Sequence, residues 1–287
     1  MRDLDENSIT QAVLERVAGA TNPRMRQISE ALVRHLHAFV KEIEPTEAEW
    51  EQAIALLTET GHLCDERRQE FILLSDTLGV STLVDAINHR NAGESTETTV
   101  FGPFFVASAP KVAAGASIAG ELTGPPLLVT GRVLDAEGAP LSDAVLDVWH
   151  ADSEGFYDVQ YSDGRVGGRA QLITDEYGDF HFWSVLPSPY PIPNDGTVGR
   201  MLAAQGRHPY RPAHVHFMIN APGHRKLVTH LFLKGGEYLD SDVVFGVKDS
   251  LIRSVQPQVR VNAESGAPEN YFLLRADFRL AAATPGR

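Results

Sequence analysis

Cysteine is almost absent from this chain of 287 residues, which contains only Cys64. A single thiol cannot form an internal disulfide, and Cys64 belongs to no metal-binding motif, so we expect a cytoplasmic protein. Long apolar runs are missing as well, since no stretch approaches the about 20 apolar residues that a membrane-spanning helix requires. The first ten residues carry acidic side chains and lack the apolar run of a signal peptide. We therefore expect no membrane span.

Positive charge is also scarce. The chain has 25 Lys and Arg against 38 Asp and Glu, which gives a formal net charge of −13. Binding to nucleic acid or to an anionic membrane needs clustered basic residues, so we expect no nucleic-acid partner. The remaining composition, with 43% hydrophobic and 22% charged residues, is ordinary for a folded globular protein.

The first part of the chain has helical periodicity. Apolar residues recur every three or four positions from residue 7 to about residue 90. Asn22–Pro23 predicts the start of one helix, and Thr46 with Glu49 predicts a capping box at the start of the next. We expect Asp65 and Ser81 to open two further helices.

Beyond about residue 105 the pattern is typical of strands. Short runs rich in Val, Leu, Phe and Thr alternate with Gly, Pro, Asn and Asp, without a helical pattern of ten residues between them. This predicts a mainly β protein, with an antiparallel β-sandwich over residues 106–287 and an N-terminal helical part over residues 1–105. The strands predicted most clearly are Leu127–Leu134, Ala144–His150, Ala170–Thr174 and Asp179–Val185.

Two histidines, His214 and His216, stand two positions apart at the head of an apolar run. In a strand their side chains share one face and can point at one metal ion. Taken alone, the pair is equally consistent with two solvated histidines. A zinc site is disfavoured because the neighbourhood has no HExxH or CxxC motif. An Fe(II) facial triad is disfavoured because Val215 stands where a carboxylate is needed.

Two tyrosines in loop sequences, Tyr157 and Tyr190, supply a different type of ligand. Either one alone is typical of a packing residue. A phenol with a pKa of about 10 is deprotonated only beside a strongly charged partner, which a trivalent cation provides. Two phenolates and a hydroxide would neutralise Fe(III), and the two imidazoles would complete its coordination.

The stretch from Val129 to Asp249 resembles the intradiol ring-cleavage dioxygenases, which include the catechol and hydroxyquinol 1,2-dioxygenases. The resemblance rests on five motifs in order: Asp147–Ala151, Gly155–Tyr157, Pro187–Tyr190, Gly206–His216 and Ala221–His224. The helical part resembles the N-terminal dimerisation portion of this family. A homodimer through these helices is therefore expected, and the resemblance allows a lipid at that interface.

The resemblance also implies the chemistry. Tyr157, Tyr190, His214 and His216 would hold one Fe(III) per subunit, with Tyr190 as the ligand that the substrate displaces. An aromatic diol and O2 would be the substrates, and both oxygen atoms would enter the product. Arg211 would stabilise negative charge on the ring. A surface salt bridge is the alternative reading of Arg211.

Within the family the chain is most similar to the hydroxyquinol enzymes, which implies a hydroxymuconate product. Asp76 could accept a hydrogen bond from the third ring hydroxyl. His230 stands where many catechol enzymes carry glutamine, and its role stays open. The residues expected to line the ring pocket are Leu73, Asp76, Val100, Phe101, Gly102, Pro103, Phe104, Ile192, Pro193, Arg211 and Val244.

Two alternatives remain at this point. Catechol or a chlorinated catechol could be the substrate of the same chemistry. The segment Gly131–Val148 also looks like the opening hairpin of prealbumin-like β-sandwich binding modules, which have no catalysis. A ferric enzyme should be coloured by phenolate-to-iron charge transfer, whereas a binding module should be colourless.

Overall fold

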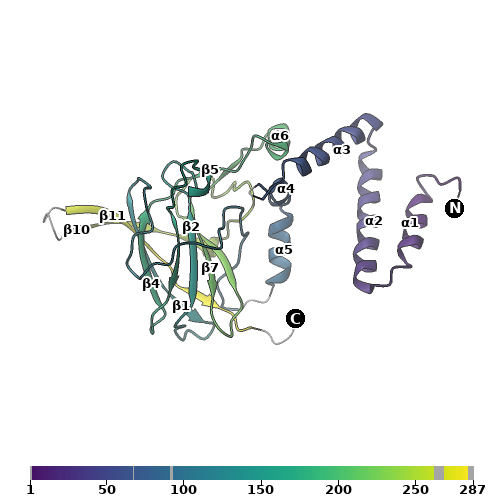
Figure 1. Ribbon diagram of the computed structural model, residues 1–287. Helices are drawn as coiled ribbons and strands as arrows, with labels where there is room; N and C mark the ends of the chain where they lie inside the picture. Colours follow the sequence, from purple (N-terminus) through teal and green to yellow (C-terminus); the bar gives the residue numbers. More distant parts are fainter. Residues whose placement is uncertain (1, 67, 91–92, 262–267, 284–287) are drawn as a thin grey trace. The chain divides into compact units, whose positions relative to one another are not determined.

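The computed structural model describes residues 2–66, 68–90, 93–261 and 268–283, which form two compact units, residues 1–59 and 60–287 (Figure 1). The first unit contains α1 (Ile9–Val17), α2 (Pro23–Ile43) and most of α3 (Glu47–His62). The second contains the remaining helices and every strand that the structure describes. The helical part and the β part predicted from periodicity are both present.

The predicted starts of α2 and α3 are confirmed. Asn22 Oδ1 accepts hydrogen bonds from the backbone N–H groups of Arg24 and Met25, at 2.9 and 3.1 Å. At α3, the Glu49 N–H donates to Thr46 Oγ1 at 3.2 Å, and the Thr46 N–H donates to Glu49 Oε2 at 2.8 Å. These reciprocal bonds satisfy backbone donors that a helix start otherwise leaves free.

The predicted starts of the next two helices are wrong. α4 (Glu70–Thr77) begins after Asp65, because the Asp65 carboxylate accepts from the Arg68 N–H at 2.6 Å in a preceding turn. α5 (Val80–Asn88) follows Gly79, whose φ of 72° lies in the left-handed region that glycine tolerates. Ser81 therefore lies inside α5, and its hydroxyl bonds Ser75 at 2.8 Å.

Within the described residues, the β part consists of two five-stranded sheets and one two-stranded sheet. The first sheet has the order β10-β11-β1-β12, with β4 also paired to β1, and the second has the order β3-β2-β7-β8-β9. The four strands predicted from sequence are confirmed to within one residue at each end. The strands are β1 (Pro126–Asp135), β2 (Val145–His150), β3 (Arg169–Ile173), β4 (Asp179–Val185), β5 (Tyr190–Pro191), β6 (Tyr210–Arg211), β7 (His214–Asn220), β8 (Leu227–Leu233), β9 (Ile252–Arg253), β10 (Val255–Val261), β11 (Pro268–Arg275) and β12 (Phe278–Leu280).

The expectation of an antiparallel sandwich is confirmed only in part, because both large sheets are mixed. β1 is antiparallel to β4 but parallel to β11 and β12, and β8 is parallel to β9. In β1, Leu127 lies opposite Phe272, which comes from near the end of the chain. Such a pairing joins distant segments, and the local spacing of strands and turns carries no signal for it.

One hydrophobic core takes side chains from both large sheets. Leu127 and Val129 of β1 and Val215 and Phe217 of β7 are fully buried in it. Because side chains alternate along a strand, the even-numbered residues of β7 point to the opposite face of its sheet. That second face of β7 carries the candidate site.

A third helix of the second unit, α6 (Thr197–Ala204), is joined to α4 by a buried carboxylate. Glu70 Oε1 accepts from the Val198 N–H at 3.0 Å and from the Thr197 hydroxyl at 3.2 Å. The carboxylate thereby satisfies a backbone donor at the start of α6. This connection brings α4 next to the segment that follows Tyr190.

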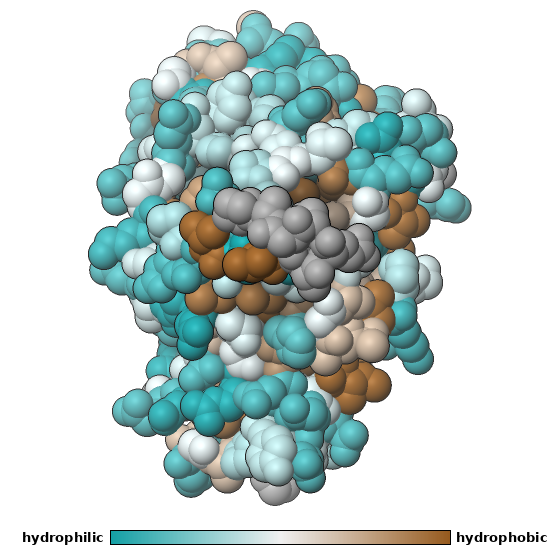
Figure 2. Space-filling view, turned by 90° about the vertical axis from the view of Figure 1, so that its left-hand side faces the viewer, coloured by the Kyte–Doolittle hydropathy of each residue, from teal (hydrophilic) through white to brown (hydrophobic). Residues whose placement is uncertain are grey.

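The face of the molecule in Figure 2 is mainly hydrophilic, with hydrophobic side chains gathered near its centre. On the edge strand β10, Val259 and Val261 are 63% and 71% exposed. Within the described residues, no helix combines the length and the apolar character that crossing a membrane would need.

Candidate active site

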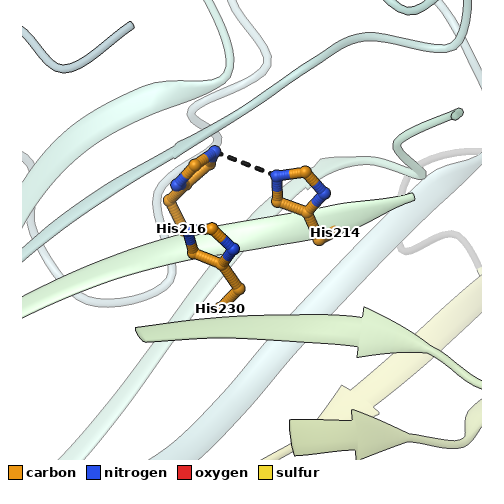
Figure 3. Close-up of side chains that lie close together, drawn as sticks. All are labelled: His214, His216 and His230. Carbon is orange, nitrogen blue, oxygen red and sulfur yellow. Dashed lines mark hydrogen bonds between the residues drawn. The ribbon is translucent and has the colours of Figure 1, made fainter. Parts of the chain in front are cut away.

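Three histidines form a buried cluster on one face of the β7–β8 pair (Figure 3). His214 and His216 come from alternate positions of β7, as predicted, and their Nε2 atoms lie 3.0 Å apart. His230 of β8 lies opposite His216 in the register. Its ring is stacked on His214, with centroids 4.7 Å apart, and lies 4.0 Å from the His216 centroid.

Both predicted tyrosines reach this cluster. Tyr157 Oη lies 2.9 Å from His216 Nε2. The Tyr190 ring lies 5.1 Å from the Tyr157 ring and 5.6 Å from the His214 ring, measured between centroids. All four side chains are buried, with at most 2% of each residue exposed. The structure therefore brings together two phenols and two imidazoles that lie far apart in the sequence.

Two further aromatic side chains are stacked on His216 and Tyr157. The Trp149 indole is stacked on His216, with a centroid distance of 4.6 Å and an interplanar angle of 13°. Phe104 is stacked on Tyr157, with a centroid distance of 4.4 Å. Stacked rings restrict rotation of the side chains that they cover, so the Tyr157–His216 contact is held from both sides.

The histidines of the cluster are neutral at pH 7. Burial lowers the pKa of His214, His216 and His230 well below the usual value of 6.5, and neighbouring positive groups add to the shift. His214 Nδ1 lies 2.7 Å from the Pro212 carbonyl, which can only accept, so Nδ1 donates and Nε2 keeps its lone pair. Neutral imidazoles of this kind are metal ligands.

The phenol of Tyr157 has the opposite shift. Burial raises its pKa well above the usual value of 10, and the neighbouring Tyr190 phenol adds to the effect. A phenol in this position keeps its proton unless a concentrated positive charge lies beside it. A highly charged metal ion supplies such a charge.

The spacing and the chemistry of these donors fit an iron ion. Two atoms bound to one first-row metal at about 2.1 Å, at roughly a right angle, lie about 3 Å apart. The contacts from His216 Nε2 to Tyr157 Oη and to His214 Nε2, 2.9 and 3.0 Å, have this spacing. Phenolate oxygen and imidazole nitrogen, without thiolate, are donors that suit iron.

Arg211 points into the site and is 2% exposed, so the alternative reading as a surface salt bridge is wrong. Its Nε and Nη2 donate to the Asp242 carboxylate at 3.1 and 3.2 Å. Its Nη1 lies 3.2 Å from His214 Nε2. Burial lowers the pKa of Arg211, but the Asp242 carboxylate together with the Tyr190 and Tyr157 side chains outweighs burial and raises it, so the guanidinium stays charged.

Comparison with known proteins identifies the family. Residues 100–282 match the family model described as Dioxygenase, and residues 22–96 match the one described as Catechol dioxygenase N terminus. The hydroxyquinol 1,2-dioxygenase of Nocardioides simplex is 52% identical over 263 residues, which cover 92% of this chain and 88% of that protein. The chain belongs to the intradiol ring-cleavage dioxygenases. Members of this family are enzymes that use non-heme iron.

Solved structures of intradiol dioxygenases have the same fold. A crystal structure of hydroxyquinol 1,2-dioxygenase from Pseudomonas putida matches with a TM-score of 0.90 and 49% identity, covering 97% of this chain and 99% of that one. Catechol 1,2-dioxygenase from Pseudomonas arvilla matches with a TM-score of 0.82 and 32% identity, covering 96% and 92%. The resemblance inferred from the motifs is confirmed, and the alternative of a non-catalytic binding module is wrong.

The residues predicted to line the ring pocket of this dioxygenase do not all lie in one environment. Four of them, Leu73, Val100, Ile192 and Val244, belong to one buried apolar cluster. Asp76 of α4 is 4% exposed, and burial raises the pKa of its carboxyl. By contrast, Phe101, Pro103 and Pro193 are partly or largely exposed, with Phe101 at 40%.

Gly102 lies close to the histidine cluster. A Cβ atom at this position would lie 3.1 Å from His216 Cε1, and its φ of +76° is one that other residues rarely adopt. Glycine is therefore required for both its backbone conformation and its small size. The segment around residue 102 covers the outer face of β7.

Sequence reasoning missed two residues of this dioxygenase site. His230 had no assigned role, although it lies directly across from His216 once β7 and β8 are paired as a hairpin. That register could have been inferred from the turn between the two strands. Asp242 was not considered, because its contact with Arg211 joins a strand to a distant loop.

Proposed function

We propose that this dioxygenase cleaves hydroxyquinol, 1,2,4-trihydroxybenzene, between its two adjacent hydroxylated carbons to give 3-hydroxy-cis,cis-muconate, the tautomer of maleylacetate. The relatives named hydroxyquinol 1,2-dioxygenase support this choice, because about half of their residues are identical over most of the chain. The single observation that carries the proposal is the buried 2.9 Å contact between Tyr157 Oη and His216 Nε2. This contact joins the two ligand types on which the chemistry depends.

The proposed reaction is balanced without a further reductant. One ring C–C bond breaks, and each of its carbons gains one oxygen atom from O2 as it becomes a carboxylate carbon. The ring is oxidised and O2 is reduced, so both electron partners are substrates. The two phenolic protons of the diol are released, so the product is a dicarboxylate.

We assign Tyr157, Tyr190, His214 and His216 as the ligands of one Fe(III) per subunit. A ferric ion bound there supplies a Lewis acid and a template that holds both diol oxygens. Tyr190 would be the ligand that the diol displaces, and its phenolate oxygen would then be the base that takes a substrate proton. Tyr157 stays in place, because Phe104 is stacked on its ring and its Oη contacts His216.

Arg211 is the fixed cation of the proposed site. It is buried and charged, and its guanidinium lies beside His214, so it can stabilise negative charge that develops on the ring. A positive group that is already in position needs no rearrangement when that charge appears.

The choice among diols depends on the pocket, which we propose is formed by the buried cluster of Leu73, Val100, Ile192 and Val244, together with Asp76. A carboxyl in an apolar pocket can accept a hydrogen bond from the third hydroxyl of hydroxyquinol. A diol without that hydroxyl would leave the buried carboxyl unpaired, which disfavours its binding. Catechol or chlorocatechol remains the second candidate substrate, supported by the catechol 1,2-dioxygenase that shares the fold.

We also propose that the chain works as a cytoplasmic homodimer, in which residues 1–105 contain the association helices and residues 106–287 contain the proposed iron ligands. The support comes from α2, whose large apolar side chains are exposed in the single chain. An exposed apolar face of this kind marks an association surface, and a lipid could share it. These residues are Met25, Ile28, Leu32, Leu36, Phe39, Val40 and Ile43.

Metal analysis combined with a visible spectrum tests the proposed function. We expect one iron per chain and a charge-transfer band that shifts when hydroxyquinol is added without oxygen. Admission of oxygen should then give the hydroxymuconate, and a panel of diols should rank hydroxyquinol above catechol. A colourless protein that contains zinc would contradict the iron assignment, and faster cleavage of catechol would contradict the substrate.

A further inference from the structure

Asp242 lies behind Arg211 in a buried ion pair. Both side chains are 2% exposed. The two oxygens of Asp242 accept from Arg211 Nε at 3.1 Å and from Arg211 Nη2 at 3.2 Å, so the carboxylate holds two donors of the guanidinium fork. A side-on contact of this kind defines the orientation of the guanidinium plane as well as its position.

The other side of the guanidinium faces the histidine cluster. Nη1 lies 3.2 Å from His214 Nε2, and Nη2 lies 3.4 Å from His230 Nδ1. Arg211 is therefore held between one carboxylate and two imidazoles. Of these partners only Asp242 carries negative charge, since the imidazoles are neutral, so it is the direct contact that balances the buried cation.

The carboxylate itself is fixed by its own turn. The Gly246 N–H donates to Asp242 Oδ2 at 2.9 Å, and the Val244 N–H donates to Oδ1 at 3.4 Å. A Cβ atom at residue 246 would lie 3.0 Å from Arg211 Nη2 and 3.2 Å from Asp242 Oδ2. The turn thus closes tightly around the ion pair, and a side chain at residue 246 would disturb it.

Two threonines attach the same turn to its surroundings. The Thr99 hydroxyl donates to the Gly246 carbonyl at 2.6 Å, and the Thr82 hydroxyl of α5 donates to the Val244 carbonyl at 3.1 Å. The turn is consequently anchored to the segment that covers β7 and to a helix. These hydrogen bonds hold the Asp242 carboxylate in place independently of Arg211, so the carboxylate determines where the guanidinium lies.

We propose that Asp242 is a positioning residue for the ring-cleavage reaction, which holds the Arg211 guanidinium against the metal centre and balances its charge. The part of this inference that concerns turnover rests on the proposed function, because it requires Arg211 to act on the bound diol. Asp242 acts through Arg211 and does not contact the substrate itself. It also links Arg211 to Val244, which lies two residues further along the same turn.

A double-mutant cycle tests the inference. Asp242→Asn keeps the shape of the side chain and removes its charge, and we expect it to lower kcat for hydroxyquinol by about 100-fold with a smaller effect on KM. In an Arg211→Gln background the same substitution should change kcat by less than about threefold, because its target is gone. Asp240→Asn, an exposed carboxylate two residues away, serves as the matched control and should leave kcat unchanged. If the fold-losses in kcat of the two single variants multiply in the double variant, the two residues act independently, and the proposal is overturned.

A second readout does not depend on turnover. In iron-free protein, Asp242→Asn leaves a buried arginine unpaired and should lower the thermal midpoint by about 10 °C. Adding Arg211→Gln should restore part of this loss, and a double variant no more stable than Asp242→Asn would overturn the pairing. Because this cycle needs no substrate, a wild-type protein that fails to cleave hydroxyquinol would contradict the proposed function alone.

Asp242→Glu covers the case in which Asp242→Asn does not fold. It keeps the negative charge and moves the carboxylate by one methylene, so we expect a folded protein with bound iron. Its kcat should still fall by about tenfold or more, because a displaced guanidinium loses its alignment with the reacting ring. A wild-type kcat in this variant would show that the position of the carboxylate does not matter, and would overturn the proposal.

Discussion

Tyr157 and His216 lie 59 positions apart in the sequence, and their Oη and Nε2 atoms meet at 2.9 Å in the interior of the second unit. One side chain comes from a loop and the other from the central strand β7, so the contact depends on how that loop is held. Asp158, the next residue after Tyr157, forms a buried ion pair with Arg169 of β3. Arg169 Nη1 also donates to the carbonyl of Phe104 at 3.1 Å, and Phe104 is stacked on Tyr157.

Replacing Arg169 should allow the Tyr157 side chain to move away from His216. Arg169→Met leaves the Asp158 carboxylate buried and unpaired, which should cost about 3 kcal/mol or more of stability. It should also lower the iron content and weaken the charge-transfer band, because Tyr157 loses its support. Denaturant unfolding and metal analysis measure the two effects. Arg165→Gln, which removes an exposed pair with Asp163, is the control and should change stability far less.

Gly102→Ala should disturb His216. The new Cβ would lie 3.1 Å from His216 Cε1 on a backbone with φ of +76°, so strain and crowding add together. We expect a loss of about 1–2 kcal/mol in stability and roughly a tenfold fall in kcat. Gly138→Ala is the matched control, because its φ is +94° and nothing lies within 4 Å of the added Cβ. It should lose similar stability and keep its kcat, and an equal fall in kcat would refute the role of His216 crowding.

The stability of Asp76→Asn relative to the wild type should depend on pH. Burial raises the pKa of Asp76 in the folded state above its ordinary value of 3.8, and the Ser81 hydrogen bond opposes only part of this shift. Above the folded-state pKa the ionised carboxylate therefore destabilises the fold, and this cost disappears as pH falls through that value towards the unfolded-state pKa. Denaturant unfolding should find Asp76→Asn favoured more strongly at pH 7 than at pH 4. A larger advantage at pH 4 would mean that the shift has the opposite sign.

Asp76 should also determine substrate preference. If its carboxyl bonds the third hydroxyl of hydroxyquinol, Asp76→Ala should reduce the ratio of kcat/KM for hydroxyquinol over catechol by about tenfold or more. Catechol provides the internal reference, since it lacks that hydroxyl and its own kcat/KM should change little. Steady-state kinetics on both diols measures the ratio, and an unchanged ratio would show that Asp76 does not determine substrate preference.

His230 should be dispensable for iron binding, although it belongs to the same cluster as two proposed ligands. Its Nδ1 lies 3.4 Å from the Arg211 guanidinium, and the two tyrosines and two histidines proposed as ligands already supply four donors to the ion. We expect His230→Gln to retain iron and the charge-transfer band, whereas His216→Gln should lose both. Metal content after exhaustive dialysis is the measurement. Loss of iron from His230→Gln would contradict this prediction and would indicate that His230 binds the metal.

The sequence allowed the strands and the candidate ligands to be predicted because both have local signals. Short runs rich in Val, Leu, Phe and Thr located β1–β4 to within one residue, and the spacing of His214 and His216 placed them on one face. The parallel pairing of β1 with β11, the role of Arg68 in delaying α4, and the contact between Asp242 and Arg211 had no such signal. Each of these depends on which partner a group finds after the chain folds.

Side chains alternate between the two faces of β7, and this limits the sequence changes that the strand can accept. The same seven residues supply core side chains at Val215, Phe217 and Ile219 and site side chains at His214 and His216. A single inserted residue in this strand would turn the phenylalanine towards the phenols and drive an imidazole between the two sheets. Insertions and deletions are therefore forbidden here, and this strand can vary only by exchanging one side chain for another.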